Sequence, residues 1–293
     1  MDFGCHLPVY GPAATREVVL GFARRMEQLG YASLWASDHV ALPWTTRSKY
    51  PYSATGEFPL PPGTDFLEPL TTLALVAGAT ERVKLGTTVL VLPHRHPVLA
   101  AKMLATLDHL TGGRVILGAG VGWMKEEIEL FGVPHERRGR WSDEALHIMR
   151  ACWRDERVSH AGEFFHFDAL GVAPKPTRGT IPIWIGGHTE TALRRVAELS
   201  DGWHAAFPSP AGLAASLTRL REMCEKVGRD FSTLTLSCRV GLPAKKGAHE
   251  LVAELRALRE LGIAHVVLET RARDLADMVA VYERFAGDVR PRL

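Results

Sequence analysis

Apolar positions follow two patterns that alternate along this chain. Short, nearly unbroken apolar runs are typical of strands buried on both faces. Longer stretches with an apolar residue every three or four positions are typical of helices with one buried side. The stretch 15–29 shows the second pattern, because Phe22, Met26 and Leu29 fall on one face and Gly30 follows. The alternation predicts an α/β protein.

Strands and the helices that follow them can be placed from these patterns. The predicted strands are 3–7, 33–37, 83–92, 114–117, 183–185, 202–204, 234–241 and 265–268. The predicted helices are 15–29, 69–80, 97–110, 125–131, 140–153, 189–199, 211–227, 248–261 and 274–285, with a short hairpin arm around 164–167. About eight β–α units close a parallel barrel, so we predict a single (β/α)8 TIM barrel domain over residues 1–293. A doubly wound open sheet is the alternative fold.

Residues 43–66 interrupt this rhythm between the second strand and the next helix. The prolines of this segment are Pro43, Pro51, Pro59, Pro61 and Pro62, and its aromatic residues include Trp44, Tyr50, Tyr52 and Phe58. A long loop in a compact domain is usually functional or disordered, and the aromatic content favours a lid. We therefore predict that this insertion after the second strand covers a site.

Composition restricts the class of protein. With 46% hydrophobic and 23% charged residues the chain resembles an ordinary globular protein, and its net charge of +2 argues against general nucleic-acid binding. Its four cysteines are far apart and lack metal-binding spacing, so we expect reduced thiols and a cytoplasmic location. We expect no signal peptide, because the first residues enter a strand-like run. We also expect no membrane span, because no apolar run approaches about 20 residues.

The pair Asp38–His39 directly follows the apolar run 33–37. In a parallel barrel the C-terminal ends of the strands form the active-site face. A carboxylate can orient an imidazole, and an imidazole can donate or accept a proton near neutral pH. We therefore predict that His39 is a catalytic acid or base and that Asp38 orients it. The alternative is that Asp38 caps local backbone and His39 only packs.

Glycine-rich turns follow two other predicted strands. Gly118–Ala119–Gly120–Val121–Gly122–Trp123 misses the GxGxxG dinucleotide pattern, because its sixth position is Trp, but its glycines would let a flat ring or a phosphate approach the backbone. Gly186–Gly187–His188–Thr189 opens a helix, whose free amides can bind an anion. Plain strand-to-helix turns, with Thr189 as a helix cap, are the alternative.

Further residues near strand ends are candidates for a substrate pocket. We expect Leu7, Trp123, Arg271 and, from the insertion, Trp44 to line it.

A metal-dependent hydrolase barrel is the alternative from another functional class. His94 and His96 have the HxH spacing seen in metal sites. Such a site would need further ligands at other strand ends, where His6, His188 and His204 occur without the expected carboxylates. We therefore expect no metal.

Taken together and in order, several segments resemble the luciferase-like monooxygenase superfamily over essentially the whole chain. The matching segments are Leu34–Val40, Leu85–Pro93, Thr106–Arg114, Gly118–Trp123, Pro182–Gly187 and Ser200–Trp203. More narrowly, the chain resembles the probable F420-dependent oxidoreductases of actinobacteria. The motifs are highly specific for the superfamily and less specific for the cofactor.

The resemblance implies a flavin or deazaflavin ring at the mouth of the barrel. It implies that His39 stands near the reactive carbon, and that a bulge at about Thr88–Val89, often with a non-proline cis peptide, backs the ring. It assigns Gly186–Thr189 to the cofactor phosphate, and the closely spaced glycines after the strand lead us to expect Gly120, Val121 and Gly122 in the cofactor site as well. Some deazaflavin sugar dehydrogenases carry an acidic proton donor where Trp123 falls here, so we expect no sugar-dehydrogenase activity.

The resulting prediction is an oxidoreductase that transfers hydride between coenzyme F420 and a small organic substrate. The alternative is a two-component monooxygenase that uses FMN supplied by a partner reductase. The Ser37–Asp38–His39 form of the second-strand motif favours the deazaflavin, and the aromatic insertion indicates an apolar or planar substrate. The resemblance also implies a homodimer.

Overall fold

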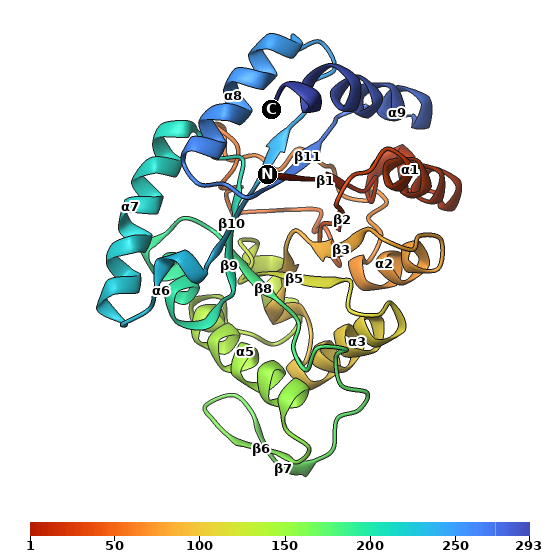
Figure 1. Cartoon of the computed structure of the whole chain (residues 1–293). Coiled ribbons are helices and arrows are strands. Elements are labelled where there is room, and N and C mark those ends of the chain that lie inside the picture. The colour runs from red at the N-terminus through yellow and green to blue at the C-terminus, as the bar shows by residue number, and fades with distance from the viewer. Residues whose placement is uncertain (273) are drawn as a thin grey trace.

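The parallel strands form a closed ring in the computed structural model, which describes residues 1–272 and 274–293 (Figure 1). The strands are β1 (Asp2–His6), β2 (Ser33–Ala36), β3 (Lys84–Thr87), β5 (Val115–Gly120), β8 (Ile183–Gly186), β9 (Gly202–Ala206), β10 (Thr235–Gly241) and β11 (His265–Glu269). Each pairs in parallel with its neighbours. Because β11 also pairs with β1 and β3 with β5, the ring of described strands closes. This is the predicted TIM barrel, and the doubly wound alternative is wrong.

Helices surround the barrel (Figure 1). They are α1 (Arg16–Gln28), α2 (Pro69–Ala77), α3 (Pro97–Leu110), α4 (Lys125–Leu130), α5 (Arg138–Arg154), α6 (Glu190–Leu199), α7 (Pro210–Lys226), α8 (Ala248–Glu260) and α9 (Leu275–Arg284). The predicted boundaries agree to within three residues. The cap at Thr189 is confirmed, because its hydroxyl accepts the amide of Ala192.

The third barrel strand is broken where the resemblance placed a bulge. It ends as β3 at Thr87 and resumes as β4 (Leu90–Val91). Between Gly86 and Leu90 this strand advances four residues, while its partner β5 advances three, from Ile116 to Ala119. One extra residue on one strand defines a bulge. The peptide bond Thr88–Val89 is cis, so both expectations for this position are confirmed.

Two segments extend beyond the barrel. The insertion joins β2 to α2, and Phe66 near its end bridges to Tyr10 after β1. The second segment is the antiparallel hairpin of β6 (Val158–Ala161) and β7 (His166–Leu170), which projects at the bottom of Figure 1 and confirms the predicted arm.

Large side chains fill the inside of the barrel. Trp35, Ile116, Trp184 and Val267 are buried together, and the ring centroids of the two tryptophans lie 5.4 Å apart. A packed interior leaves the mouth, at the C-terminal ends of the strands, as the place where polar groups can meet a ligand.

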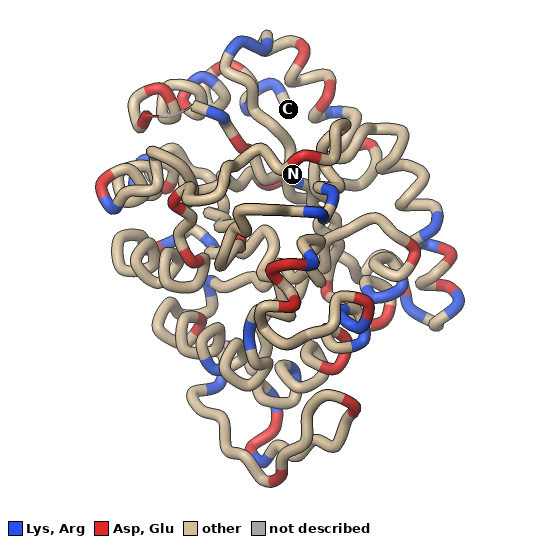
Figure 2. The backbone as a smooth tube through the Cα atoms, turned by 180° about the vertical axis from the view of Figure 1, so that it is seen from behind, with Lys and Arg blue, Asp and Glu red and all other residues tan. Residues whose placement is uncertain are grey.

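Positions of Lys and Arg and of Asp and Glu are interspersed along the outer helices on the face that Figure 2 shows. The chain carries 35 Lys and Arg against 33 Asp and Glu, so neither sign prevails in its composition. All four cysteines are free and buried. In the part of the chain that the structure describes, we find no helix with the length and apolar character needed to span a bilayer.

Candidate active site

His39 lies just beyond the end of β2, at the barrel mouth. Its Nδ1 is 2.7 Å from Oε2 of Glu127 in α4, and its side chain is 11% exposed. The other oxygen of Glu127 accepts the backbone amides of Val40 and Ala41. One carboxylate therefore holds both the imidazole and the chain that follows it. Glu127 is 88 residues from His39, and no sequence spacing pointed to it.

The carboxylate of Glu127 is buried but ionised. Burial raises its pKa, but its hydrogen bonds to His39 and to the amide of Ala41 outweigh that effect. Together they hold the pKa of Glu127 below its ordinary value. The site therefore contains a fixed negative charge behind His39.

Asp38 does not have the role predicted for it. Its two oxygens accept the guanidinium of Arg95 at 2.6 and 2.9 Å, and one of them accepts the amide of Val91 at 2.9 Å. Burial lowers the pKa of Arg95, but its bonds to Asp38 and Glu68 raise it overall. The prediction that Asp38 orients His39 is corrected: Asp38 ties the end of β2 to β4, and Glu127 orients the ring.

Aromatic rings enclose the remaining side of His39. The ring centroids of Phe58, Phe66 and Trp123 lie 4.9, 5.3 and 6.1 Å from the imidazole. Tyr50 packs 5.1 Å from both Phe58 and Trp123. Because three of these rings belong to the insertion, the insertion covers His39 in this structure. We call these four rings the aromatic cage.

Arg239 of β10 lies beneath the bulge and was not among the predicted residues. It donates to the carbonyl of Thr88 at 3.1 Å and to the hydroxyl of Ser37 at 3.0 Å. Its other nitrogens bind Glu269 at 3.1 and 2.8 Å, and Tyr10 also donates to that carboxylate. Burial raises the pKa of Glu269, but Arg239 chiefly lowers it to about 2. The sequence signal was a lone arginine inside the buried strand 234–241.

Val89 packs between two of the predicted cofactor glycines. A Cβ on Gly120 would lie 2.4 Å from Val89, and one on Gly186 would lie 3.0 Å from it. Gly122 has a φ of +77°, and its Cβ would lie 2.8 Å from Val91. The absence of side chains at these glycines therefore makes room for the bulge. The half-buried Val89 then presents an apolar surface at the mouth, which we call the apolar seat.

The turn after β8 has mixed features for a phosphate site. His188 and Thr189 are exposed before α6, where free amides favour an anion, but Glu190 adds a negative charge to the first turn. Gly187 has a φ of +104°, and a Cβ there would lie 3.0 Å from Ala192. A side chain at Gly187 would strain the turn itself.

The other predicted pocket residues are dispersed. Leu7 is fully buried in the core, Trp44 is 85% exposed, and Arg271 is exposed. Of the predicted pocket residues, Trp123 lies in the aromatic cage, and Tyr50, Phe58 and Phe66 complete it.

The two histidines of the HxH pair lie in separate surroundings. The ring of His94 is buried between Asp38 and Glu127, at 3.9 and 3.8 Å, and neither ring nitrogen has a hydrogen bond. His96 accepts the amide of Val98 and packs on Phe165. Among residues 1–272 and 274–293, we find no group of three or more His, Cys, Asp or Glu placed to hold a metal ion.

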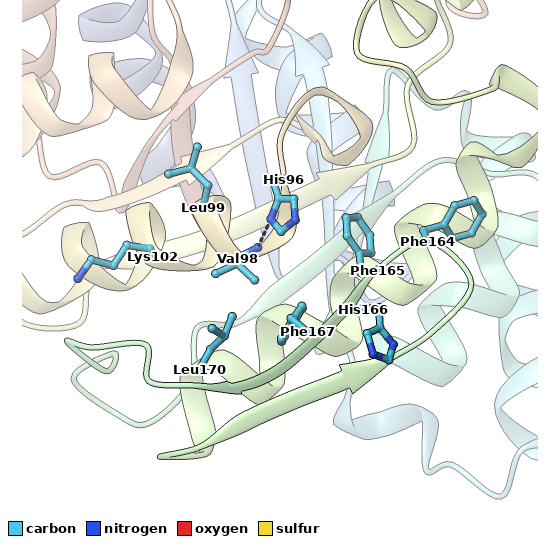
Figure 3. Close-up of a pocket in the computed structure, with 9 residues that line it drawn as sticks. All are labelled: His96, Val98, Leu99, Lys102, Phe164, Phe165, His166, Phe167 and Leu170. Carbon is cyan, nitrogen blue, oxygen red and sulfur yellow. Dashed lines mark hydrogen bonds between the residues drawn. The ribbon is translucent and has the colours of Figure 1, made fainter.

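An open cleft of about 600 Å³ lies away from the barrel mouth, between α3 and the β6–β7 hairpin. Figure 3 shows the rings of His96, Phe165 and Phe167 turned toward it and Lys102 extending away. Its lining is mainly apolar and lacks an ion-paired acid–base group of the kind found at His39 among the residues drawn. The chemistry of the molecule therefore gathers at the mouth rather than in this cleft.

Known proteins are similar to this chain along most of its length. A family model described as luciferase-like monooxygenase matches residues 3–288. An uncharacterized protein of Mycobacterium tuberculosis is 36% identical over 207 residues, which is 71% of this chain and 71% of that protein.

Two solved structures have the same architecture. An F420-dependent secondary alcohol dehydrogenase, in complex with an F420–acetone adduct, matches with a TM-score of 0.81 at 18% identity, over 100% of this chain and 99% of that one. The FMN complex of the oxygenating constituent of 3,6-diketocamphane monooxygenase from Pseudomonas putida matches with a TM-score of 0.76 at 18% identity, over 100% and 98%. At these identities the likeness shows the fold alone.

Proposed function

Because this chain belongs to the luciferase-like monooxygenase family, we propose that it is an oxidoreductase that transfers hydride between coenzyme F420 and a small organic substrate. The observation that carries the proposal is the meeting of three features at one barrel mouth: the carboxylate-bound His39, the bulge at Thr88–Val89 and the aromatic cage. Fold alone would not support it, since one fold hosts many chemistries.

The residues at the mouth fit a flat, largely apolar ring. Val89 offers an apolar seat, and the aromatic cage adds apolar surface around His39. When bound, the deazaflavin supplies a carbon that gives or takes hydride. The residues of the chain would hold the ring against the bulge, and His39 would exchange the accompanying proton with the substrate.

The test is a fluorescence titration of the purified protein with coenzyme F420 and, separately, with FMN. We expect saturable binding of F420 and at least tenfold weaker binding of FMN. Val89→Ala should weaken F420 binding roughly tenfold, because it removes two apolar carbons from the seat. Val98→Ala, in the remote cleft, is the matched control and should bind like wild type. Binding of neither cofactor by the wild type would refute the proposal.

The second candidate is an FMN-dependent monooxygenase, because the family model that matches this chain is described as luciferase-like monooxygenase. It would receive reduced FMN from a separate reductase. Preferential FMN binding, with oxygen uptake only when reduced FMN is supplied, would select this function.

The finer expectations about assembly and location also remain proposals. We propose one barrel domain with residues 43–66 as its lid, assembled as a homodimer, which sedimentation of the purified chain would test. The four free, buried thiols are consistent with a reducing compartment such as the cytoplasm.

A further inference from the structure

The two ring nitrogens of His39 have unlike surroundings. Nδ1 faces the carboxylate of Glu127 at 2.7 Å. Within the described part of the chain Nε2 has no hydrogen-bond partner, and the rings of Phe58, Phe66 and Trp123 pack around the imidazole. Because an ionised carboxylate can only accept, Nδ1 must carry a hydrogen. The neutral imidazole then has its lone pair on Nε2.

The oxygens of Glu127 are divided between two tasks. Oε1 accepts the amides of Val40 and Ala41, and Oε2 accepts the ring of His39. Because backbone amides can only donate, the atom in the Oε1 position must be an acceptor. The backbone amides therefore fix which of the two terminal atoms of the side chain faces His39.

The other ionisable groups around the pair leave this assignment intact. Behind Glu127 lies His94, whose pKa burial lowers, so this ring is neutral near pH 7. Beyond His94, the guanidinium of Arg95 balances the negative charge of Asp38 in an ion pair. Within the aromatic cage, burial raises the pKa of Tyr50, which stays protonated. Glu127 is therefore the one charged group in hydrogen-bond contact with His39 among the described residues.

We propose that Glu127 is a positioning residue that holds His39 in the Nδ1–H tautomer and so makes Nε2 the proton-exchanging atom of the reaction. The proposal rests on the proposed function. When substrate is oxidised, the bound deazaflavin would supply the hydride acceptor, and the proton released by the substrate would pass to the lone pair of Nε2. In the opposite direction Nε2–H returns the proton. Either way, Nδ1 keeps its hydrogen and Glu127 stays ionised.

Glu127→Gln tests this with almost no change of shape. The amides of Val40 and Ala41 require the glutamine oxygen, so the NH2 group must take the place of Oε2 and point at His39. A donor there forces Nδ1 to accept. The neutral ring should therefore switch to the Nε2–H tautomer and lose the lone pair on Nε2.

The direct readout is the tautomer of His39 in 15N-histidine-labelled protein, assigned by comparison with His39→Gln. We expect Nδ1–H in wild type and Nε2–H in Glu127→Gln. We also expect single-turnover hydride transfer to fall by at least about 100-fold, the lower range for general acid–base catalysis, with F420 affinity within about twofold.

The hairpin supplies a matched control. Glu144 also binds a histidine, His160 at 2.9 Å, and the backbone amides of 163–165, but its partners belong to the hairpin and not to His39, the bulge or the aromatic cage. Glu144→Gln should change neither the His39 tautomer nor the rate.

Two results would overturn the proposal: an unchanged Nδ1–H tautomer in Glu127→Gln, or a switched tautomer with a wild-type rate. If the wild type binds neither cofactor, the proposed function fails and Nε2 loses its assigned reaction. The tautomer measurement would still report whether Glu127 determines the tautomer of His39.

Discussion

Two sets of histidines in the same barrel show how the hydrogen-bond partner of an imidazole decides whether the ring has a structural or a chemical role. Inside the barrel, His204 bonds to the hydroxyls of Thr88 and Ser237, both at 2.9 Å. His265 bonds to Ser237 at 3.3 Å and to Ser33 at 2.8 Å. All four of these ring nitrogens are therefore engaged. At the mouth, His39 has one nitrogen on a carboxylate and, among the described residues, no hydrogen-bond partner for the other.

The difference lies in what each partner can do. A hydroxyl can donate or accept, so it satisfies a buried ring in either tautomer, whereas a carboxylate only accepts and fixes the tautomer. Burial lowers the pKa of both His204 and His265 to about 3, so these rings stay neutral and structural. The predictions below test this contrast between the interior and the mouth.

The largest effect is expected from His39→Ala. Turnover should fall by roughly 100- to 10,000-fold, because the proton-exchanging group is lost, while F420 binding stays nearly intact. Single-turnover reduction or oxidation of bound cofactor measures this. Asp38→Asn should act instead on stability, because Asp38 bonds to Arg95 rather than to His39. A wild-type rate in His39→Ala would show that this imidazole takes no part in proton transfer and only lines the pocket.

Arg239 links the two regions, because it binds the carbonyl of Thr88, whose hydroxyl binds His204. Arg239→Met leaves the buried Glu269 unpaired and should lower the free energy of unfolding by about 3–5 kcal/mol. Urea denaturation measures this loss. The double variant Arg239→Met/Glu269→Leu should recover much of it. Equal losses in both would mean that the ion pair is not the cause.

Acid should act on the interior histidines. Their pKa in the folded state is about 3, below the unfolded value of about 6.5. Between these values the unfolded chain binds more protons, so stability is lost as the pH falls from about 6.5 toward 3. Replacing His204 or His265 by Gln should reduce this slope by up to about 1.4 kcal/mol per pH unit for each ring. Denaturation curves across that range measure it, and unchanged slopes would contradict the assignment.

The smallest effect is expected at the lid. Glu126, next to Glu127 in α4, accepts the amide of Arg47 at 2.6 Å and the hydroxyl of Ser48 at 2.7 Å. Glu126→Gln should loosen residues 43–66 and raise KM about two- to fivefold, because hydrogen bonds to a neutral amide are weaker than hydrogen bonds to a carboxylate. Limited proteolysis and steady-state kinetics measure this. Glu129→Gln on the same helix, which removes only a pair with Lys125, is the control. Faster proteolysis with unchanged KM would mean that the lid does not cover the substrate.

Local spacing was enough to determine the fold and the neighbourhood of the site. Strand and helix periods depend on residues a few positions apart, so the alternation of elements, the closed barrel and the hairpin could be predicted. The family resemblance added the bulge at Thr88–Val89. The position of His39 at a strand end followed from the same periodicity, because all strands of a parallel barrel end at one mouth.

Only the tertiary structure decided which side chains touch. Sequence adjacency favoured Asp38 as the partner of His39, but successive residues after a strand project in different directions. Barrel closure instead brought Glu127 to His39 across 88 positions and Arg95 to Asp38 across 57. The same closure put Arg239 beneath the bulge, whereas the path of the insertion left Trp44 in solvent and set Phe58 on the imidazole. These pairings depend on distances across the closed barrel, which no local pattern encodes.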